Sequence, residues 1–352
     1  MSEIPSLLSR KSWAAKRKTI NSQPIKLLQE ELVEVSCLTS NATLPLVIES
    51  RLPGLDLPTW VAANLDYIES LLLKHGGLLF RGFGIENKSA FRSFLNSTSV
   101  ELMNYLEGAT PRTELGDGIY TSTEFPPDQT IALHNELSYV NTFPMKIWFC
   151  CIEPARERGE TPIADMRRVL QRINPTIRKR FLDKGWMLVR NFGDGFSLSW
   201  EKAFHANCRD QVEEYCRHAA IDFEWKSDNR LRTRQVRSPI AVHPVTAEPI
   251  WFNHISFWHV SSLTPALGQM LLAEFQPQDL PYNTYYGDGA EIEDSVIEEI
   301  REAYLQETVR FAWQRGDVLM LDNMLTAHGR NPYRGPRRIL TAMGQPQSRA
   351  LV

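Results

Sequence analysis

The chain of 352 residues has no long hydrophobic run, no excess of one charge and no regular spacing of cysteines. No stretch approaches the roughly eighteen consecutive apolar residues that a membrane-spanning helix needs. Its 39 Lys and Arg residues are balanced by 42 Asp and Glu residues, so the net charge of −3 provides no basic field to attract nucleic acid. The N-terminus also lacks the apolar segment of a secretion signal. These absences predict a cytoplasmic protein that binds neither membranes nor nucleic acids.

The cysteines are too few and too irregularly placed to organise the fold. There are five, and no pair has the CxxC spacing of zinc knuckles or redox sites. Cys150 and Cys151 lie within the apolar run 146–152, where we expect them to act as small hydrophobic residues rather than as reactive thiols. A disulfide framework is therefore not expected.

Nucleotide-binding signatures are also missing. The chain contains neither GxGxxG nor GxxxxGK[ST], and its apolar segments do not alternate as regular βαβ units. This argues against a Rossmann or P-loop fold.

The segments that are present predict one main domain. Residues 1–50 look like a peripheral N-terminal arm whose short basic cluster is solvated, with contact to phosphate or a membrane surface as the alternative. Residues 51–352 are expected to form a single domain. Within it, the polar segment at about 107–130 predicts a lid-like loop, and residues at about 190–240 predict an insertion.

Short apolar runs bounded by Gly, Pro, Asn and Asp predict many strands. They lie at 78–83, 130–134, 146–152, 161–166, 186–190, 240–243, 249–254, 317–322 and 338–343. Helical periodicity predicts helices at 60–74, 91–106, 167–183, 210–220, 265–275 and 294–306. The pattern predicts a mainly β fold, a barrel or sandwich with helical buttresses.

Two of the eight histidines suggest a metal site. His134 ends a predicted strand, and because residues i and i+2 of extended chain share a face, His134 and Glu136 can converge on one ion. His328 follows the strand 317–322, where a turn could direct it inward. Two histidines and one carboxylate on one face of a metal leave open positions, as in non-haem Fe(II) oxygenases. An HxE pair alone is common by chance and would then have only a structural role.

Two further residues favour the metal interpretation. Arg338 begins the strand 338–343 and could bind a carboxylate through a bidentate pair of hydrogen bonds. Thr161 begins another strand, and its hydroxyl could donate to the same carboxylate.

These segments resemble the taurine dioxygenase/clavaminate synthase (TauD/TfdA) family of Fe(II)- and 2-oxoglutarate-dependent oxygenases. The resemblance runs from about residue 78 to residue 343, in the family's order and near its spacing. The segments that carry it are HNELSY (134–139), GETPIAD (159–165), WFN (251–253), GDVLMLDN (316–323) and HGRNPYRGPRRI (328–339).

The resemblance implies a double-stranded β-helix, or jelly-roll, core. It implies that His134, Glu136 and His328 hold Fe(II), with 2-oxoglutarate and O2 as cosubstrates. Arg338 would bind the distal carboxylate of 2-oxoglutarate, supported by Thr161. The neighbouring Arg337 is the alternative, and Arg338 is preferred because it directly precedes the strand, as the family's arginine does.

The resemblance also narrows the reaction. Glutamate at position 136 is similar to clavaminate synthase and to the SyrP-type amino-acid β-hydroxylases of peptide antibiotic pathways. Taurine-type enzymes have a further arginine where this chain has Ala342, so a sulfonate substrate is not expected. Related halogenases lack a carboxylate at the position of Glu136, which favours hydroxylation over halogenation. We expect hydroxylation of an unactivated carbon, the β-carbon of an amino acid that is free or tethered to a carrier protein, with release of succinate and CO2.

Two alternatives stay open. The same centre could catalyse desaturation, cyclisation or epoxidation, because substrate placement decides the outcome. The protein could instead be a non-catalytic member of the fold that binds a small acid, although the complete set of expected ligands argues against this.

The remaining candidates concern the substrate. Arg112 and Thr123, in the loop before His134, could bind a substrate carboxylate or a phosphopantetheine arm, and Ser138, Tyr139 and Asn253 could line the pocket; each could equally have a structural role. The histidines at 243, 254 and 259 are expected to pack rather than to bind metal. If a carrier presents the substrate, Arg330, Arg334 and Arg337 could border the pocket mouth. The oligomeric state is not predicted.

Overall fold

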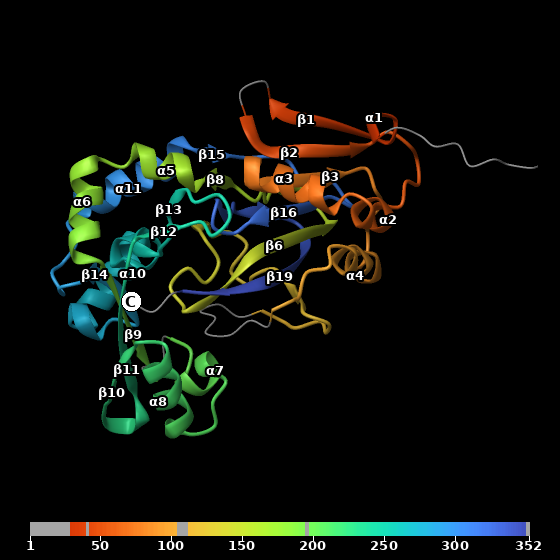
Figure 1. Cartoon of the computed structure of the whole chain (residues 1–352). Coiled ribbons are helices and arrows are strands. Elements are labelled where there is room, and N and C mark those ends of the chain that lie inside the picture. The colour runs from red at the N-terminus through yellow and green to blue at the C-terminus, as the bar shows by residue number, and fades with distance from the viewer. Residues whose placement is uncertain (1–28, 40–41, 104–111, 194–196, 350–352) are drawn as a thin grey trace, which may run out of the picture.

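The computed structural model describes residues 29–39, 42–103, 112–193 and 197–349. In this part of the chain two sheets face each other across an apolar core (Figure 1). The strands of the larger sheet, in spatial order, are β1 (Val33–Thr39), β2 (Ala42–Ser50), β3 (Gly77–Arg81), β16 (Val318–Asp322), β6 (Thr142–Glu153), β19 (Arg338–Ser348) and β4 (Ile119–Thr121). The strands of the smaller sheet are β15 (Thr308–Val309), β8 (Ile163–Asp165), β17 (Thr326–Arg330) and β5 (Ile131–His134).

The position of β6 inside the larger sheet explains why residues 146–152 are apolar without alternation. Ile147, Phe149 and Cys151 point into the core between the two sheets. Trp148 and Cys150 point to the opposite face, which helices cover. Both faces of β6 are therefore buried. Cys150 and Cys151 are free thiols in this strand, and burial raises the pKa of each.

Helices cover both sides of this two-sheet core (Figure 1). The outer face of the larger sheet packs on α2 (Leu57–Ala62), α3 (Leu65–His75) and α4 (Lys88–Ser97). A second core is built around α5 (Met166–Arg172), α6 (Pro175–Lys184), α9 (Ile255–Trp258) and α11 (Asp294–Gln306). The expected architecture is therefore found, mainly β with a jelly-roll core and helical buttresses.

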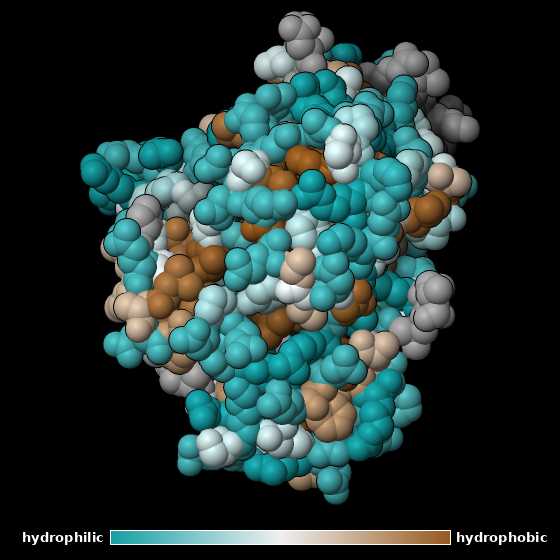
Figure 2. All heavy atoms as spheres, turned by 90° about the vertical axis from the view of Figure 1, so that its left-hand side faces the viewer, coloured by the Kyte–Doolittle hydropathy of each residue, from teal (hydrophilic) through white to brown (hydrophobic). Residues whose placement is uncertain are grey.

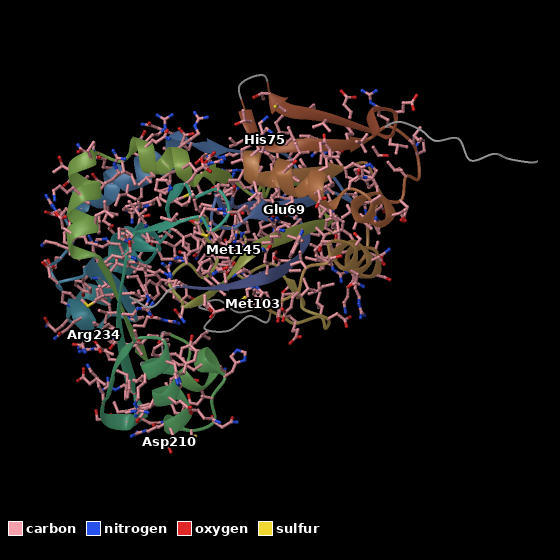
Figure 3. The ribbon with its side chains drawn as sticks, viewed as in Figure 1. Glu69, His75, Met103, Met145, Asp210 and Arg234 are labelled. Carbon is pink, nitrogen blue, oxygen red and sulfur yellow. The ribbon has the colours of Figure 1, made fainter. Side chains whose placement is uncertain are left out.

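A third sheet carries a lobe that projects from this framework. Its strands, in spatial order, are β10 (Asp222–Trp225), β11 (Leu231–Arg237), β9 (Trp186–Phe192) and β14 (Tyr282–Tyr286), and α7 (Trp200–Phe204) and α8 (Arg209–His218) pack beside it. Asp210 in α8 lies at the lower end of this lobe, far from Met145 of β6 (Figure 3). The segment expected as an insertion at about 190–240 falls within this lobe.

The remaining elements are short. They are α1 (Gln29–Leu32), β7 (Glu157–Arg158), β18 (Tyr333–Arg334), β12 (Ile240–Val242), β13 (Pro249–Trp251), α10 (Pro265–Glu274) and the 3-10 helices Ser227–Asn229, Val260–Ser262 and Pro277–Asp279. Most strands and helices predicted from the sequence are found within a few residues of the expected positions.

Two expectations about the chain's organisation need correction. Residues 1–28 of the expected N-terminal arm lie outside the described residues, but β1 and β2 are strands of the larger sheet. β2 pairs in parallel with β3, and Leu46 and Ile48 are buried under α2 and α3, so residues 42–50 belong to the core. The lid-like loop also differs: residues 107–111 lie outside the described residues, and residues 119–121 form the edge strand β4.

The surface is mostly hydrophilic, and separate hydrophobic patches interrupt it on the face shown in Figure 2. Exposed apolar side chains on α10 include Leu267, Met270 and Leu272. No helix in the described segments combines the length and apolarity required to cross a bilayer.

Candidate metal centre and adjoining cavities

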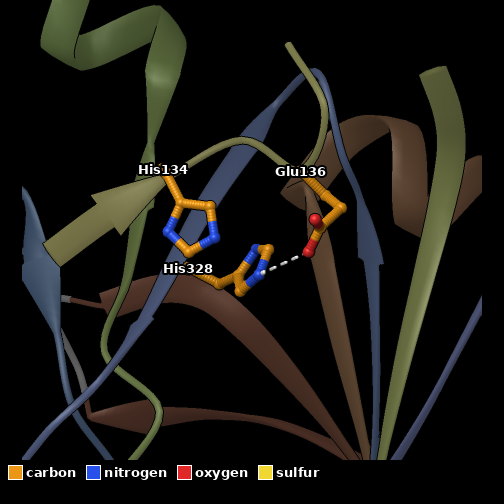
Figure 4. A group of neighbouring side chains, drawn as sticks. All are labelled: His134, Glu136 and His328. Atoms are coloured by element: carbon orange, nitrogen blue, oxygen red, sulfur yellow. Dashed lines mark ion pairs between the residues drawn. The ribbon is translucent and has the colours of Figure 1, made fainter. Parts of the chain in front are cut away.

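Three predicted ligands converge at one end of the smaller sheet. His134, at the end of β5, and His328, in β17, are direct partners in the antiparallel ladder. Glu136 lies in the turn that follows β5, and a ligand atom from each of the three residues lies within 4.8 Å of those of the others. Figure 4 shows the three side chains pointing toward one another, with His328 Nε2 3.7 Å from Glu136 Oε2. A turn at residues 323–325 follows the strand as expected, and pairing of β17 with β5 then places His328 opposite His134.

The protonation states suit a divalent cation. Partial burial of the ring, with the charge of His328 next, lowers the pKa of His134 to about 4, so His134 is neutral at pH 7. Burial alone would raise the pKa of Glu136, but the Arg112 guanidinium, His328 and His134 together outweigh burial and hold the pKa below its usual range. Metal ligands must be neutral imidazoles and ionised carboxylates, and both groups are already in that form.

The donor atoms also fit. Nδ1 of His134 lies 2.8 Å from the carbonyl oxygen of Ala132, so as an N–H donor it leaves Nε2 free to face the site. The ring of His328 is held between those of His134 and Phe149, with centroid distances of 4.6 and 5.0 Å. Two imidazoles and one carboxylate could hold Fe(II) and leave positions open.

Arg112, predicted as a substrate residue, contacts the predicted metal ligand Glu136. Its guanidinium lies 2.6 Å from Glu136 Oε2, and both side chains are almost fully buried. Arg112 also lines the adjoining cavities. In this structure Arg112 therefore balances the negative charge of the Glu136 carboxylate and orients it.

Asn323 anchors the backbone that carries Glu136. Its side-chain oxygen accepts a hydrogen bond from the Glu136 N–H at 2.7 Å. Its amide nitrogen donates to the carbonyl oxygens of Glu136, at 2.9 Å, and of Pro144, at 2.8 Å. Asn323 is fully buried in the turn that joins β16 to β17, so one side chain ties together the segments that bear two of the three ligands.

We expect Asn323→Ala to reduce the free energy of unfolding by about 2–4 kcal/mol, because it leaves buried backbone groups without partners. It should also weaken Fe(II) binding by at least about tenfold, since it frees the turn that positions Glu136. Denaturant unfolding and metal titration measure the two effects. Asn331→Ala, which removes one partly exposed hydrogen bond to Glu160, is the matched control and should change neither by much. Wild-type metal affinity in Asn323→Ala would contradict the positioning role.

A narrow cavity of about 30 Å³ adjoins the ligands on one side. Its lining includes His134, Thr161, His328, Arg337 and Thr341. Thr161 Oγ1 accepts a hydrogen bond from Trp313 Nε1 at 3.1 Å, so its own O–H remains available to donate. Thr341 Oγ1 is buried without a hydrogen-bond partner among the described residues. Thr341 was not predicted from the sequence.

The structure places Arg337, rather than the preferred Arg338, beside the ligands. Arg338 begins β19 at an irregular point of its pairing with β6, and Arg337 precedes the strand. Arg338 is exposed, whereas Arg337 lines the narrow cavity. Burial, with the nearby charge of Arg330 next, lowers the pKa of Arg337 to about 10, which still leaves it charged at neutral pH.

A larger cavity of about 470 Å³ opens on the other side of the ligands. Arg112, Thr123, His134 and Glu136 line it, as does the predicted Tyr139. Two other predicted substrate residues do not. Ser138 is buried with its hydroxyl 2.6 Å from His254 Nδ1, and the side chain of Asn253 bonds the backbone at Pro239 and Ile255.

His254 was assigned only a packing role from the sequence, but it lines the larger cavity. Its ring lies 5.7 Å from that of His134 and 4.9 Å from that of Tyr139, measured between centroids. Burial first, and then the charges of its neighbours, lower its pKa well below the ordinary value. The spacing of the histidines along the chain could not indicate this, because α9 brings His254 to the site from a distant segment.

The three arginines expected to border the pocket mouth do not form one rim. Arg330 is buried and donates to the carbonyl oxygens of Phe125, Pro126 and Gln129. Arg337 is in the narrow cavity, and only Arg334 is fully exposed, with 85% of its side chain accessible. Burial of two of these guanidinium groups removes them from any surface that a carrier could contact.

Comparison with known sequences identifies a matching family model and two relatives. A model described as "Taurine catabolism dioxygenase TauD, TfdA family" matches residues 40–343. Dapdiamide synthesis protein DdaC of Enterobacter agglomerans is 42% identical over 279 residues, which cover 79% of this chain and 85% of DdaC. A clavaminate synthase-like protein of Arabidopsis thaliana is 29% identical over 306 residues, covering 83% and 89% of the two chains.

Solved structures share the fold. The crystal structure of PvcB from Pseudomonas aeruginosa matches with a TM-score of 0.54 at 16% identity, over 92% of this chain and 95% of PvcB. Another structure of PvcB, described as an Fe, alpha-ketoglutarate dependent oxygenase from an isonitrile synthetic pathway, matches over the same shares with a TM-score of 0.53 at 15% identity.

Proposed function

Because the chain belongs to the taurine catabolism dioxygenase (TauD/TfdA) family, and is thus an Fe(II)- and 2-oxoglutarate-dependent oxygenase, we propose that it hydroxylates an unactivated carbon of an amino-acid substrate. The observation that carries the proposal is the convergence of His134, Glu136 and His328 between two cavities. The narrow cavity is lined by Arg337, whose guanidinium can pair with one carboxylate of a dicarboxylate. The other is large enough for a small-molecule substrate.

In this proposal His134, Glu136 and His328 hold Fe(II), and Arg337 with Thr161 binds the distal carboxylate of 2-oxoglutarate. The bound iron, 2-oxoglutarate and O2 supply oxidation of a C–H bond, coupled to conversion of 2-oxoglutarate into succinate and CO2. The chain's own residues orient the reactants and exclude water. Arg112 helps to keep Glu136 ionised. Phe257, whose ring lies 4.8 Å from that of His134, forms part of the cavity wall beside the ligands.

Three features support hydroxylation of an amino-acid substrate in specialised metabolism. The DdaC relative is named for dapdiamide synthesis, and PvcB comes from an isonitrile synthetic pathway. Glu136 occupies the position that a halogenase would leave without a carboxylate. The substrate cavity combines aromatic walls with a few polar groups, as small-molecule sites do. We place the reaction at the β-carbon, on a substrate that is free or carrier-bound, and the free thiols of the chain fit a cytoplasmic enzyme.

Anaerobic titration of the protein with Fe(II) and then 2-oxoglutarate tests the cofactor pair. We expect the visible charge-transfer band of an iron-chelated 2-oxo acid to appear on addition of 2-oxoglutarate, and iron-dependent succinate formation on admission of O2. Mass spectrometry of the product would then separate hydroxylation, which adds one oxygen atom, from desaturation or cyclisation, which removes hydrogen. Bound iron with neither a band nor succinate would overturn the proposal in favour of a non-catalytic acid-binding protein.

A further inference from the structure

Arg190 is a buried cation in the wall of the larger cavity. It lies in the middle of β9 and is 8% exposed. Trp186, Leu188 and Phe192 share its face of the strand, because side chains alternate along β9, and each of them is buried in an apolar cluster. A guanidinium group on the apolar side of a central strand is an unusual choice that packing does not explain.

The partners of Arg190 are aromatic rings rather than anions. Its guanidinium carbon lies 4.7 Å from the ring centroid of Phe192, 5.7 Å from that of Tyr139 and 5.7 Å from that of Trp258. Within the described residues no carboxylate or hydrogen-bond acceptor contacts its side chain. These rings hold the group in position, but they leave its N–H donors without acceptors.

Three other arginines of this chain are paired with carboxylates, and the buried Arg330 donates to three backbone carbonyl oxygens. Arg112 binds Glu136, Arg232 binds Asp279, and Arg81 binds Asp317. In the part of the chain that the structure describes, Arg190 has neither kind of partner, and an anion that approaches its guanidinium within this enclosed wall would form a strong charge-assisted pair. Because Arg190 lines a cavity of about 470 Å³, the missing acceptor can come from a molecule bound there.

The position of Arg190 separates it from the 2-oxoglutarate site. Arg337 lines the narrow cavity and Arg190 lines the larger one, while His134 lines both. Besides burial, the charges of both Arg190 and His134 contribute to lowering the pKa of His254, which also lines the larger cavity. The ligand cluster is therefore flanked by two separate cationic pockets, each suited to one carboxylate.

We propose that Arg190 binds a carboxylate of the substrate and so fixes which carbon lies beside the metal ligands. This inference rests on the proposed function, in which the larger cavity holds the substrate. A bidentate pair between guanidinium and carboxylate fixes direction as well as distance, and the surrounding rings exclude water from it. Arg190 is a positioning residue, and a neutral amide in place of the carboxylate would leave its charge unpaired.

The carboxylate can come from two sources. A free amino acid offers its α-carboxylate, whereas an acyl group on a carrier has lost that group to the thioester and must offer a second carboxylate. Two probe sets distinguish them: the proteinogenic L-amino acids with their α-carboxamides, and the N-acetylcysteamine thioesters of L-aspartate and L-asparagine. The aspartyl thioester keeps a side-chain carboxylate, and the asparaginyl thioester does not.

The experiment compares wild type, Arg190→Gln, Arg190→Lys and the control Arg234→Gln. Arg234 lies on the adjacent strand β11, where 35% of its side chain is exposed and pairs with Glu224 (Figure 3). Each protein is first checked for the iron–2-oxoglutarate band, which does not involve Arg190. Probe binding to the protein loaded with Fe(II) and 2-oxoglutarate is then measured anaerobically by calorimetry, so that no turnover is needed.

In wild type and Arg234→Gln, we expect a free acid to bind on the order of 100-fold more tightly than its amide, or the aspartyl thioester to bind that much more tightly than the asparaginyl one. In Arg190→Gln this preference should disappear, and Arg190→Lys should restore part of it. An unchanged preference in Arg190→Gln, equal binding of acid and amide in wild type, or no binding of any probe would each overturn the inference. Absence of the iron–2-oxoglutarate band in wild type would instead overturn the proposed function.

Discussion

Replacement of His328 by alanine should abolish substrate oxidation and lower Fe(II) affinity by more than about 100-fold, since even residues that only support a metal ligand change affinity by 10- to 100-fold. The expectation follows from the ladder between β5 and β17, which places His328 opposite His134 and within 3.7 Å of Glu136. No other described histidine or carboxylate joins this cluster. Two ligands would remain, and they cannot retain the metal on their own.

Iron content after desalting and anaerobic Fe(II) titration measure this loss, and the band formed with 2-oxoglutarate reports the same site. His218→Ala is the control, because His218 is an exposed residue at the end of α8 in the projecting lobe. It should bind Fe(II) as wild type does. If His328→Ala retained wild-type affinity while remaining folded, the three-residue cluster would not be the iron site.

The cluster of three candidate ligands was predictable because a metal site of this kind demands particular residue types at short spacing. His134 and Glu136 are separated by one residue, and the chain has few histidines to consider as the third ligand. The spatial arrangement was less accessible. A turn was expected to direct His328 inward, but its pairing with His134 across β17 and β5 was not predicted, because such long-range pairing leaves no local sequence signal.

The residues that line the larger cavity were even harder to predict from the sequence. Arg190 and His254 reach the larger cavity from β9 and from the beginning of α9, segments separated from His134 by more than fifty residues in the sequence. Asn253, by contrast, was predicted from its motif, but its side chain forms hydrogen bonds with the backbone at Pro239 and Ile255. Similarly, β2 resembled a peripheral arm because its burial depends on parallel pairing with β3, thirty residues later.

The two neighbouring arginines at the beginning of β19 provide the second large expected effect. Arg337→Met should raise the KM for 2-oxoglutarate on the order of 100-fold, because it removes the buried cation that would pair with the distal carboxylate. Arg338→Met should change the KM by less than about twofold, since the side chain of Arg338 is exposed. Both changes remove one positive charge at almost the same place in the sequence, so net charge cannot explain a difference between them.

Titration of the iron–2-oxoglutarate band measures binding directly and separates it from turnover. The surroundings of the two side chains make the result decisive, because Arg337 lines the narrow cavity whereas Arg338 is exposed. A large loss in Arg338→Met with little change in Arg337→Met would mean that the strand begins in a different register in solution. Equally small losses of 2-oxoglutarate affinity in both variants would place its distal carboxylate elsewhere. Arg330, which is buried and lines the same narrow cavity, would then be the next residue to replace. The comparison therefore tests the cofactor site through the geometry of one strand, independently of the substrate.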